Sequence, residues 1–304
     1  MGKGLSMKKI FFISYILLSA WLFVQAATSR PEPEYKDFTF LVNSDIHQTE
    51  STSRRDAQQS SFFRDIITPD NNTSAVLFAG DLTDNGRDTE FAVFTEKWIR
   101  PITNLMPTKP HMGLYLCKGN HDEASGSNTQ LLKYLKKEYG DFCYSFDING
   151  LHFACCDKYP QKICLGGVLS WLKKDLKKIE SINPKIPGSG TPVVIFFHYN
   201  ITGPFSEWWS VDCGNCMCAS SKSEKDYFFD AIKNYNIQGI FFGHVHCSYS
   251  ALWRKKFRIT GVGGDQYAFC QYKPSTKTVD IKFKDEMGRV YPWESLPRTE
   301  FVEL

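Results

Sequence analysis

Beyond its first 26 residues, the 304-residue sequence lacks any apolar run near the ~20 residues that a membrane-spanning helix requires. It also lacks internal repeats, low-complexity stretches and a linker that would divide it. Its composition, 42% hydrophobic and 23% charged, is typical of a globular protein rather than a disordered or fibrous one. We therefore expect a single soluble domain.

The sequence also lacks a large excess of positive or negative charge. The formal net charge is +3, and the first 26 residues hold three lysines and no acid, so the remainder is neutral. A basic surface that selects nucleic acid or an anionic membrane is therefore not indicated.

The first 26 residues have the pattern of a secretory signal peptide. Three lysines precede the apolar stretch Ile10–Val24, and small residues at Val24 and Ala26 form a cleavage pattern. An uncleaved anchor is the alternative, but the apolar stretch is short for a span. We expect cleavage after Ala26, a secreted or extracytoplasmic protein, and a single domain over residues 27–304.

An exported chain with an even number of cysteines favours disulfide bonds, although the sequence does not give their pairing. The ten cysteines are Cys117, Cys143, Cys155, Cys156, Cys164, Cys213, Cys216, Cys218, Cys247 and Cys270. A structural zinc at Cys213-x-x-Cys216-x-Cys218 would need a fourth ligand, and none is nearby in the sequence. Asn71, Asn72 and Asn200 each begin a glycosylation sequon.

Five short apolar runs predict buried strands, and each is followed at once by Asp, Asn or His. The runs are Phe38–Val42, Ala75–Phe78, Met112–Leu116, Pro192–Phe197 and Ile237–Phe242. The polar residues that follow them are Asp45, His47, Asp81, Asn120, His121, His198, His244 and His246. These include five of the seven histidines of the chain.

Helical segments separate these strands. Apolar spacing predicts helices over Asp88–Ile102 and from Val168 to about Ile179, and Ser221-x-x-Glu224 reads as a capping box opening a third helix through about Tyr235. Asn149-Gly150 indicates a hairpin, and the part after His246 has the pattern of consecutive strands. We predict an α/β fold in which two packed sheets are flanked by helices.

The polar residues at the strand ends suit a metal site, because loops at the carboxyl ends of strands converge on one crevice. Carboxylate, amide oxygen and imidazole together favour zinc, manganese or iron. Two such divalent cations could share one carboxylate, clamp a phosphoryl group and lower the pKa of a bridging water, which then attacks as hydroxide.

The same ordered blocks resemble the calcineurin-like metallophosphoesterase superfamily. The blocks are Asp45-x-His47, Gly80-Asp81-x-x-Asp84, Gly119-Asn120-His121-Asp122, His198 and Gly243-His244-x-His246. The resemblance spans residues 45–246 and implies a four-layer αββα sandwich that hydrolyses small-molecule phosphate esters.

The resemblance also implies a role for each residue. Asp45, His47 and His246 would hold one metal ion, whereas Asn120, His198 and His244 would hold the other, with Asp81 bridging the two. His121 would face the substrate, stabilising phosphoryl charge or protonating the leaving oxygen. Asp122 would orient the His121 ring.

At two positions the sequence differs from known branches of the superfamily, and these differences indicate which branch it resembles. Asn85 stands where protein Ser/Thr phosphatases carry a phosphate-gripping Arg, and Asp84 stands where purple acid phosphatases carry a Tyr ligand. The run from Gly80 to Gly86 instead resembles the branch of cyclic-nucleotide and glycerophosphodiester phosphodiesterases, which also contains phosphomonoesterases.

Several alternatives stay open at this point. A protein or polyphosphate phosphatase and a metal-free binding module of the same fold are the competing functions, and the oligomeric state is undetermined. Trp208-Trp209 is either an aromatic plug or a substrate rim. We expect His152 to be a structural residue, and we assign His111 no role.

Overall fold

The computed structural model describes residues 35–126, 128–159, 167–202 and 223–297. The chain divides into two units, Met1–Tyr35 and Lys36–Leu304, and all the elements below belong to the second. The predicted signal peptide, Trp208-Trp209 and the Cys213–Cys218 motif lie outside the described residues. Within the described residues, no helix has both the length and the apolar character needed to cross a membrane.

In the described part of the chain, twelve strands form two mixed sheets of six strands each. In the first sheet β1, β2 and β3 are parallel, and β10, β11 and β12 continue it antiparallel in the order β12-β11-β10-β1-β2-β3. These strands are β1 (Phe38–Asn43), β2 (Thr73–Ala79), β3 (Leu114–Cys117), β10 (Gln266–Lys273), β11 (Thr278–Asp285) and β12 (Val290–Pro292).

In the second sheet, of order β4-β5-β6-β7-β9-β8, the four inner strands are parallel and the two edge strands antiparallel. Its strands are β4 (Cys143–Ile148), β5 (Leu151–Cys156), β6 (Pro192–Phe196), β7 (Asn236–Phe242), β8 (Tyr249–Trp253) and β9 (Phe257–Gly261). The predicted hairpin at Asn149-Gly150 joins β4 to β5.

The two sheets pack face to face, with side chains alternating between the two sides of each strand. In β1, Phe40 points into the space between the sheets and meets Phe153 of β5 and Phe241 of β7 at ring-centroid distances of 5.2 and 6.1 Å. Its neighbour Leu41 belongs instead to a second apolar core that includes Phe62 on the helical side. This alternation yields one core between the sheets and one beneath the helices.

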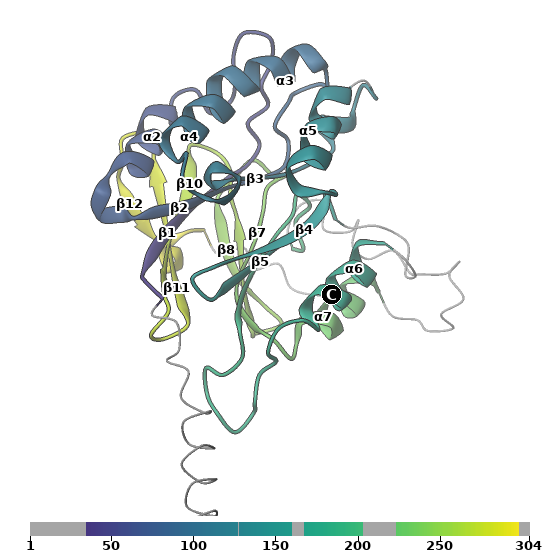
Figure 1. The fold of residues 1–304 in the computed structure, drawn as a ribbon, viewed down its shortest axis with the longest axis vertical. Helices are drawn as coiled ribbons and strands as arrows, with labels where there is room; N and C mark the ends of the chain where they lie inside the picture. Colours follow the sequence, from purple (N-terminus) through teal and green to yellow (C-terminus); the bar gives the residue numbers. More distant parts are fainter. Residues whose placement is uncertain (1–34, 127, 160–166, 203–222, 298–304) are drawn as a thin grey trace, which may run out of the picture. The chain divides into compact units, whose positions relative to one another are not determined.

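Helices cover the two outer faces of the sheets (Figure 1), which gives the predicted αββα layers. The first sheet is covered by α2 (Gln59–Ile67), α3 (Asp88–Phe94), α4 (Arg100–Leu105) and α5 (Thr129–Tyr139). The second is covered by α6 (Val168–Leu176) and α7 (Glu224–Ile232). The four-layer sandwich predicted from the sequence is confirmed.

The helices differ from the predictions in three respects. The single helix expected over Asp88–Ile102 is interrupted by a π-helical segment, Thr95–Ile99, between α3 and α4. The predicted capping box is wrong. The helix α7 begins at Glu224, so Ser223 is its N-cap, and the capping box pairs Ser223 with Asp226. Helices α2 and α5 and the short strand β12 were not predicted.

Candidate metal centre

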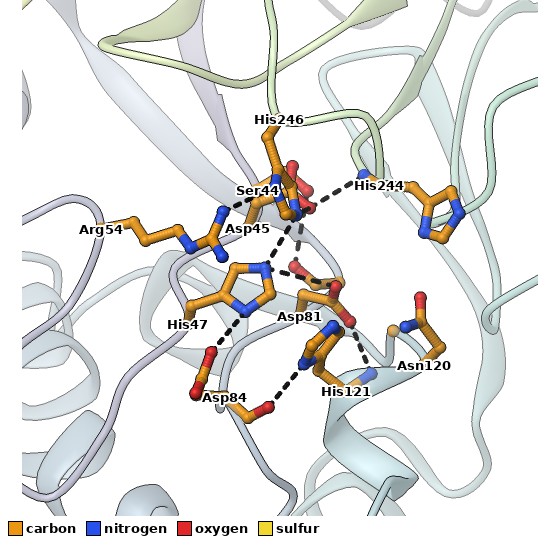
Figure 2. A network of polar contacts seen from close by, with 12 residues as sticks. Ser44, Asp45, His47, Arg54, Asp81, Asp84, Asn120, His121, His244 and His246 are labelled. Atoms are coloured by element: carbon orange, nitrogen blue, oxygen red, sulfur yellow. Dashed lines mark hydrogen bonds and ion pairs between the residues drawn. The ribbon is translucent and has the colours of Figure 1, made fainter. Parts of the chain in front are cut away.

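All seven predicted metal donors lie together at the carboxyl ends of the parallel strands, as Figure 2 shows for six of them. They follow β1, β2 and β3 of the first sheet and β6 and β7 of the second: Asp45, His47, Asp81, Asn120, His198, His244 and His246. The parallel strands of both sheets therefore direct their C-terminal loops to one place.

One donor set combines Asp45, His47 and His246 with Asp81. The Nε2 atoms of His47 and His246 are 3.0 Å apart. His47 Nε2 lies 3.5 Å from Asp81 Oδ2, and His246 Nε2 lies 3.7 Å from Asp45 Oδ1. The two carboxyl groups and the two imidazoles thus surround a common point, as ligands of one cation would.

A second donor set combines Asn120, His198 and His244 with the same Asp81. His198 Nε2 lies 3.0 Å from Asn120 Oδ1, 3.3 Å from His244 Nδ1 and 3.2 Å from Asp81 Oδ2. Asp81 Oδ2 is therefore near histidines of both sets, which is the geometry expected of a shared carboxylate.

The hydrogen bonding of two carboxylate oxygens also indicates that these residues suit a pair of cations. Asp45 Oδ2 and Asp81 Oδ2 are buried, and neither accepts a hydrogen bond from any described residue. A buried carboxylate oxygen without a hydrogen bond costs free energy unless a positive charge compensates it. The donor chemistry, carboxylate with imidazole and amide oxygen, suits zinc, manganese or iron.

Two of the predicted donor histidines are oriented with Nε2 toward the centre. His198 donates from Nδ1 to the carbonyl oxygen of Ala79 at 3.0 Å, and His47 donates from Nδ1 to Asp84 Oδ1 at 2.9 Å. Each of these contacts assigns the proton to Nδ1 and directs Nε2 inward. Such partners fix the tautomer and the orientation of a metal-binding ring.

Electrostatics keep several imidazoles in the form that binds metal. Burial lowers the pKa of His47 to about 4 and, together with the charge of His198, that of His244 to about 3. Burial opposes a charge on His198 as well, but the Asp81 carboxylate outweighs it and raises the pKa of His198 to about 9. Burial likewise raises the pKa of Asp81, but the positive charge of His198 holds it well below its usual range.

The backbone at the predicted donors is held in an uncommon conformation. Five of the seven predicted donors have positive φ angles: Asp45 (52°), His47 (46°), Asp81 (50°), His244 (72°) and His246 (54°). Non-glycine residues pay a cost of about 1 kcal/mol or more in this region, and such strain gathers at functional sites. This clustering could not be read from the sequence.

The glycines of the motifs are explained by close packing. A Cβ on Gly119 would collide with the Asp81 carboxylate, and one on Gly80 would collide with the His198 ring. Gly80 also has a φ of +92°, which other residues adopt only with strain. The Gly-Asp and Gly-Asn-His-Asp motifs therefore need glycine so that the donors can approach one another.

His121 lies beside the donors, but its ring is not held as expected. Its Nδ1 donates to the carbonyl oxygen of Asp84 at 2.5 Å, and its backbone N–H donates to Asp81 Oδ1 at 2.9 Å. The prediction that Asp122 orients this ring is wrong. The buried Asp122 carboxylate instead accepts hydrogen bonds from the backbone N–H groups of Leu82, Thr83 and Gly119.

Asp122 therefore joins the two loops that carry Asp81 and Asn120. Burial and the nearby Asp81 charge raise the pKa of Asp122 to about 6, although these backbone N–H groups partly offset the rise. Its role is thus to fix loop geometry, and the His121 ring is oriented by a backbone carbonyl.

Sequence reasoning missed three residues around the centre. Arg54 contacts His246 Nδ1 at 2.6 Å, and buried Arg55 donates to the carbonyl oxygen of Ser44, with its Nη2 4.0 Å from Asp45 Oδ2. The Tyr199 ring lies 4.7 Å from the His244 ring, centroid to centroid. The Arg54-Arg55 pair follows the Asp45-x-His47 motif by seven residues, and this short spacing is a sequence signal for cationic side chains near the site.

The other two histidines and the described cysteines belong to neither donor set. His152 is buried between two carboxylates on β4 and α6, as expected of a structural residue. The His111 ring packs against the rings of Tyr115 and Tyr139. Six cysteines lie in the described part of the chain, and none of them forms a disulfide: Cys117, Cys143, Cys155, Cys156, Cys247 and Cys270.

Comparison with known proteins places this arrangement in a family. The sequence is 24% identical over 206 residues to purple acid phosphatase 23 of Arabidopsis thaliana, a match over 64% of this chain and 40% of that protein. The fold is similar to the purple acid phosphatase PPD1 of Lupinus luteus, with a TM-score of 0.59, 13% identity and coverage of 85% of this chain and 53% of that one. The chain thus spans about half or less of the length of these relatives.

Two further structures share the fold. A dimetal phosphatase from Danio rerio has a TM-score of 0.50, 12% identity and coverage of 84% of this chain and 99% of that one. GAP50, the anchor in the inner membrane complex of Plasmodium, has a TM-score of 0.52, 11% identity and coverage of 87% and 90%. The likeness to the cyclic-nucleotide and glycerophosphodiester branch stays a prediction.

The family model for calcineurin-like phosphoesterases matches residues 38–248. This range begins with β1 and ends just after His246, so it contains both donor sets. The chain belongs to the calcineurin-like phosphoesterase family.

Proposed function

We propose that this chain is a metal-dependent hydrolase of small-molecule phosphate esters that works with two divalent cations. The observation that carries the proposal is the pair of donor sets that share Asp81 Oδ2. Asp45, His47 and His246 would hold one cation, and Asn120, His198 and His244 the other. When bound, such a pair supplies positive charge for the phosphoryl group and activates water as the nucleophile.

The residues of the chain provide orientation and a proton donor. Because the Nδ1 of His121 donates to the Asp84 carbonyl, Nε2 is the ring nitrogen left for the substrate, and it has no hydrogen-bond partner among the described residues. His121 is half-buried beside the donors, so in its protonated form it can stabilise phosphoryl charge or protonate the leaving oxygen. Asp84 meanwhile holds His47 in its ligand orientation.

A phosphodiester or phosphomonoester of low molecular weight is the proposed substrate. The protein-phosphatase alternative is disfavoured at Asn85, where that class carries its Arg. The Asn85 amide donates to Glu90 Oε1 at 2.9 Å and to Asp84 Oδ2 at 3.1 Å, so it is committed within its own loop. The metal-free alternative shares only the fold, whereas this chain retains every predicted donor.

Export is part of the proposal as well. Residues 1–26 would act as a signal peptide, leaving residues 27–304 as the mature single domain outside the cytosol. If the host glycosylates exported proteins, exposed Asn72 and half-buried Asn71 are the available sequons, because the Asn200 side chain is fully buried. N-terminal sequencing of the mature protein tests the cleavage site.

The decisive experiment is metal analysis and a substrate panel on the same purified sample. We expect about two divalent cations per chain and release of nitrophenol from bis-nitrophenyl phosphate or nitrophenyl phosphate, with little activity on phosphopeptides. Removal of metal by a chelator should abolish turnover, and added manganese or zinc should restore it. A sample that binds no cation would rule out the proposal.

A further inference from the structure

Arg54 reaches the edge of the first donor set from the loop between β1 and α2. Its side chain is exposed, its backbone N–H donates to the carbonyl oxygen of Ile46 at 2.9 Å, and its Nη1 lies 2.6 Å from His246 Nδ1. Figure 2 shows the guanidinium approaching His246 from the side opposite His244. An arginine in direct contact with a histidine is unusual, because both side chains are cations or hydrogen-bond donors in their charged forms.

This contact has a consequence for the His246 tautomer. A guanidinium has only N–H donors, so His246 Nδ1 must accept the hydrogen bond. In the neutral imidazole the proton then lies on Nε2, the atom that faces His47 Nε2 and Asp45 Oδ1. A neutral imidazole cannot use a protonated nitrogen as a metal ligand. The Arg54 contact and coordination through His246 Nε2 therefore exclude each other.

Arg54 also differs from the other cationic side chains near the centre. Arg55 is buried against Ser44 and Asp45, and Arg87 pairs with Glu50 at 3.5 Å. Lys118 and Lys158 both pair with Glu123. By contrast, Arg54 has no carboxylate partner among the described residues. Its guanidinium is exposed at the edge of the donor set, and no acid of the described segments neutralises it.

We propose that Arg54 exchanges partners, leaving His246 when the first donor set takes a cation and then donating to the oxygens of the bound phosphate. This inference rests on the proposed function. A guanidinium presents its donors in a rigid fork that matches phosphate oxygens. Since Asn85 is committed to Glu90, the phosphate-binding arginine of this chain comes from the loop after β1 rather than from the loop after β2.

Metal binding to the full chain, stripped with a chelator, tests the first half of the exchange. Mn²⁺ is titrated calorimetrically into the wild type, Arg54→Gln and Arg54→Lys. Arg87→Gln is the matched control, because it also removes one exposed positive charge from a loop near the site. We expect Arg54→Gln to bind Mn²⁺ several-fold more tightly than both the wild type and Arg87→Gln. Equal affinities in Arg54→Gln and Arg87→Gln would overturn the exchange at His246.

Inorganic phosphate tests the second half. Its affinity for the metal-loaded proteins is measured by calorimetry, so the result does not depend on turnover. We expect Arg54→Gln to weaken phosphate binding by roughly tenfold or more, because it removes charge-assisted hydrogen bonds. Arg54→Lys should recover part of the loss, and Arg87→Gln should match the wild type.

The outcomes separate this inference from the proposed function. If the wild type binds no Mn²⁺, the proposed function itself fails. If it binds Mn²⁺ and all the variants bind phosphate equally well, only the phosphate-binding role of Arg54 is overturned. Thermal unfolding of each variant confirms that the exposed substitutions leave the fold intact.

Discussion

Two buried clusters of histidine and carboxylate lie at different ends of the parallel strands. The candidate metal centre follows the carboxyl ends, whereas His152 lies near the start of β5, in register with Val193 at the start of β6. His152 donates to Asp147 at 2.8 Å and to Asp175 at 2.9 Å. Ser145 and Lys178 supply two further hydrogen bonds to the Asp175 carboxylate.

The difference between the clusters is hydrogen-bond satisfaction. At His152, protons stand between each nitrogen and its carboxylate, so the cluster is complete without a ligand. At the candidate metal centre, one buried oxygen of Asp45 and one of Asp81 accept no hydrogen bond from described residues. Buried carboxylate oxygens that have no hydrogen-bond donor call for a cation, whereas a cluster whose hydrogen bonds are complete serves the fold.

The sharpest test of this contrast removes one carboxylate charge from each cluster. Asp81→Asn should reduce turnover by roughly a thousandfold or more, because it weakens both cations at once and metal charge contributes several kcal/mol to the transition state. Metal content measured by mass spectrometry should fall in parallel. Turnover near that of the wild type would contradict the bridging assignment.

Asp175→Asn is the matched change in the other cluster. It should leave turnover and metal content unchanged while lowering the melting temperature, because His152 and Lys178 lose a charged partner. If Asp175→Asn were as inactive as Asp81→Asn, the two clusters would not have separate roles.

A smaller effect is expected at His121, which lies at the centre but outside both donor sets. His121→Ala should lower turnover by about a hundredfold, a typical contribution of a positioned proton donor. Metal content should stay near two per chain, because the ring is held by the Asp84 carbonyl rather than by the donors. Loss of metal in this variant would make His121 a ligand.

Much of the fold could be predicted because its signals are local. Each buried strand is an apolar run, and the Asn149-Gly150 turn fixes one hairpin. The amphipathic helices α2 and α5 were overlooked, and the Asp88–Ile102 pattern did not reveal its π-helical interruption. A pattern of apolar spacing shows which face is buried, but it does not specify the hydrogen-bond ladder along the backbone.

The convergence of the candidate donors could be predicted as well, because each follows a strand and parallel strands end at one edge of a sheet. Their partners could not. Asp84 binds His47 through its carboxylate and His121 through its carbonyl, and Asp122 binds backbone N–H groups across two loops. Those contacts depend on how loops with positive φ angles turn, which residue type alone does not determine.

The smallest expected effect is the contribution of the His152 cluster to the pH dependence of stability. Burial opposes a charge on His152, but Asp147 and Asp175 outweigh it and raise its pKa from 6.5 to about 9. A raised folded-state pKa stabilises the fold fully below about pH 6.5, and this stabilisation is lost as the pH rises through about 9. We expect about 2 kcal/mol from this source, because the exposed Asp147 side chain is screened by solvent.

Urea unfolding of chelator-stripped protein from pH 6 to 10 measures this contribution. His198, whose pKa is also raised to about 9, contributes to the wild-type curve in the same direction. The difference between the wild type and His152→Gln therefore isolates His152, and it should shrink as the pH approaches 10. Parallel curves would mean that the His152 cluster holds no extra proton, and its assignment as a hydrogen-bonded structural cluster would then fail.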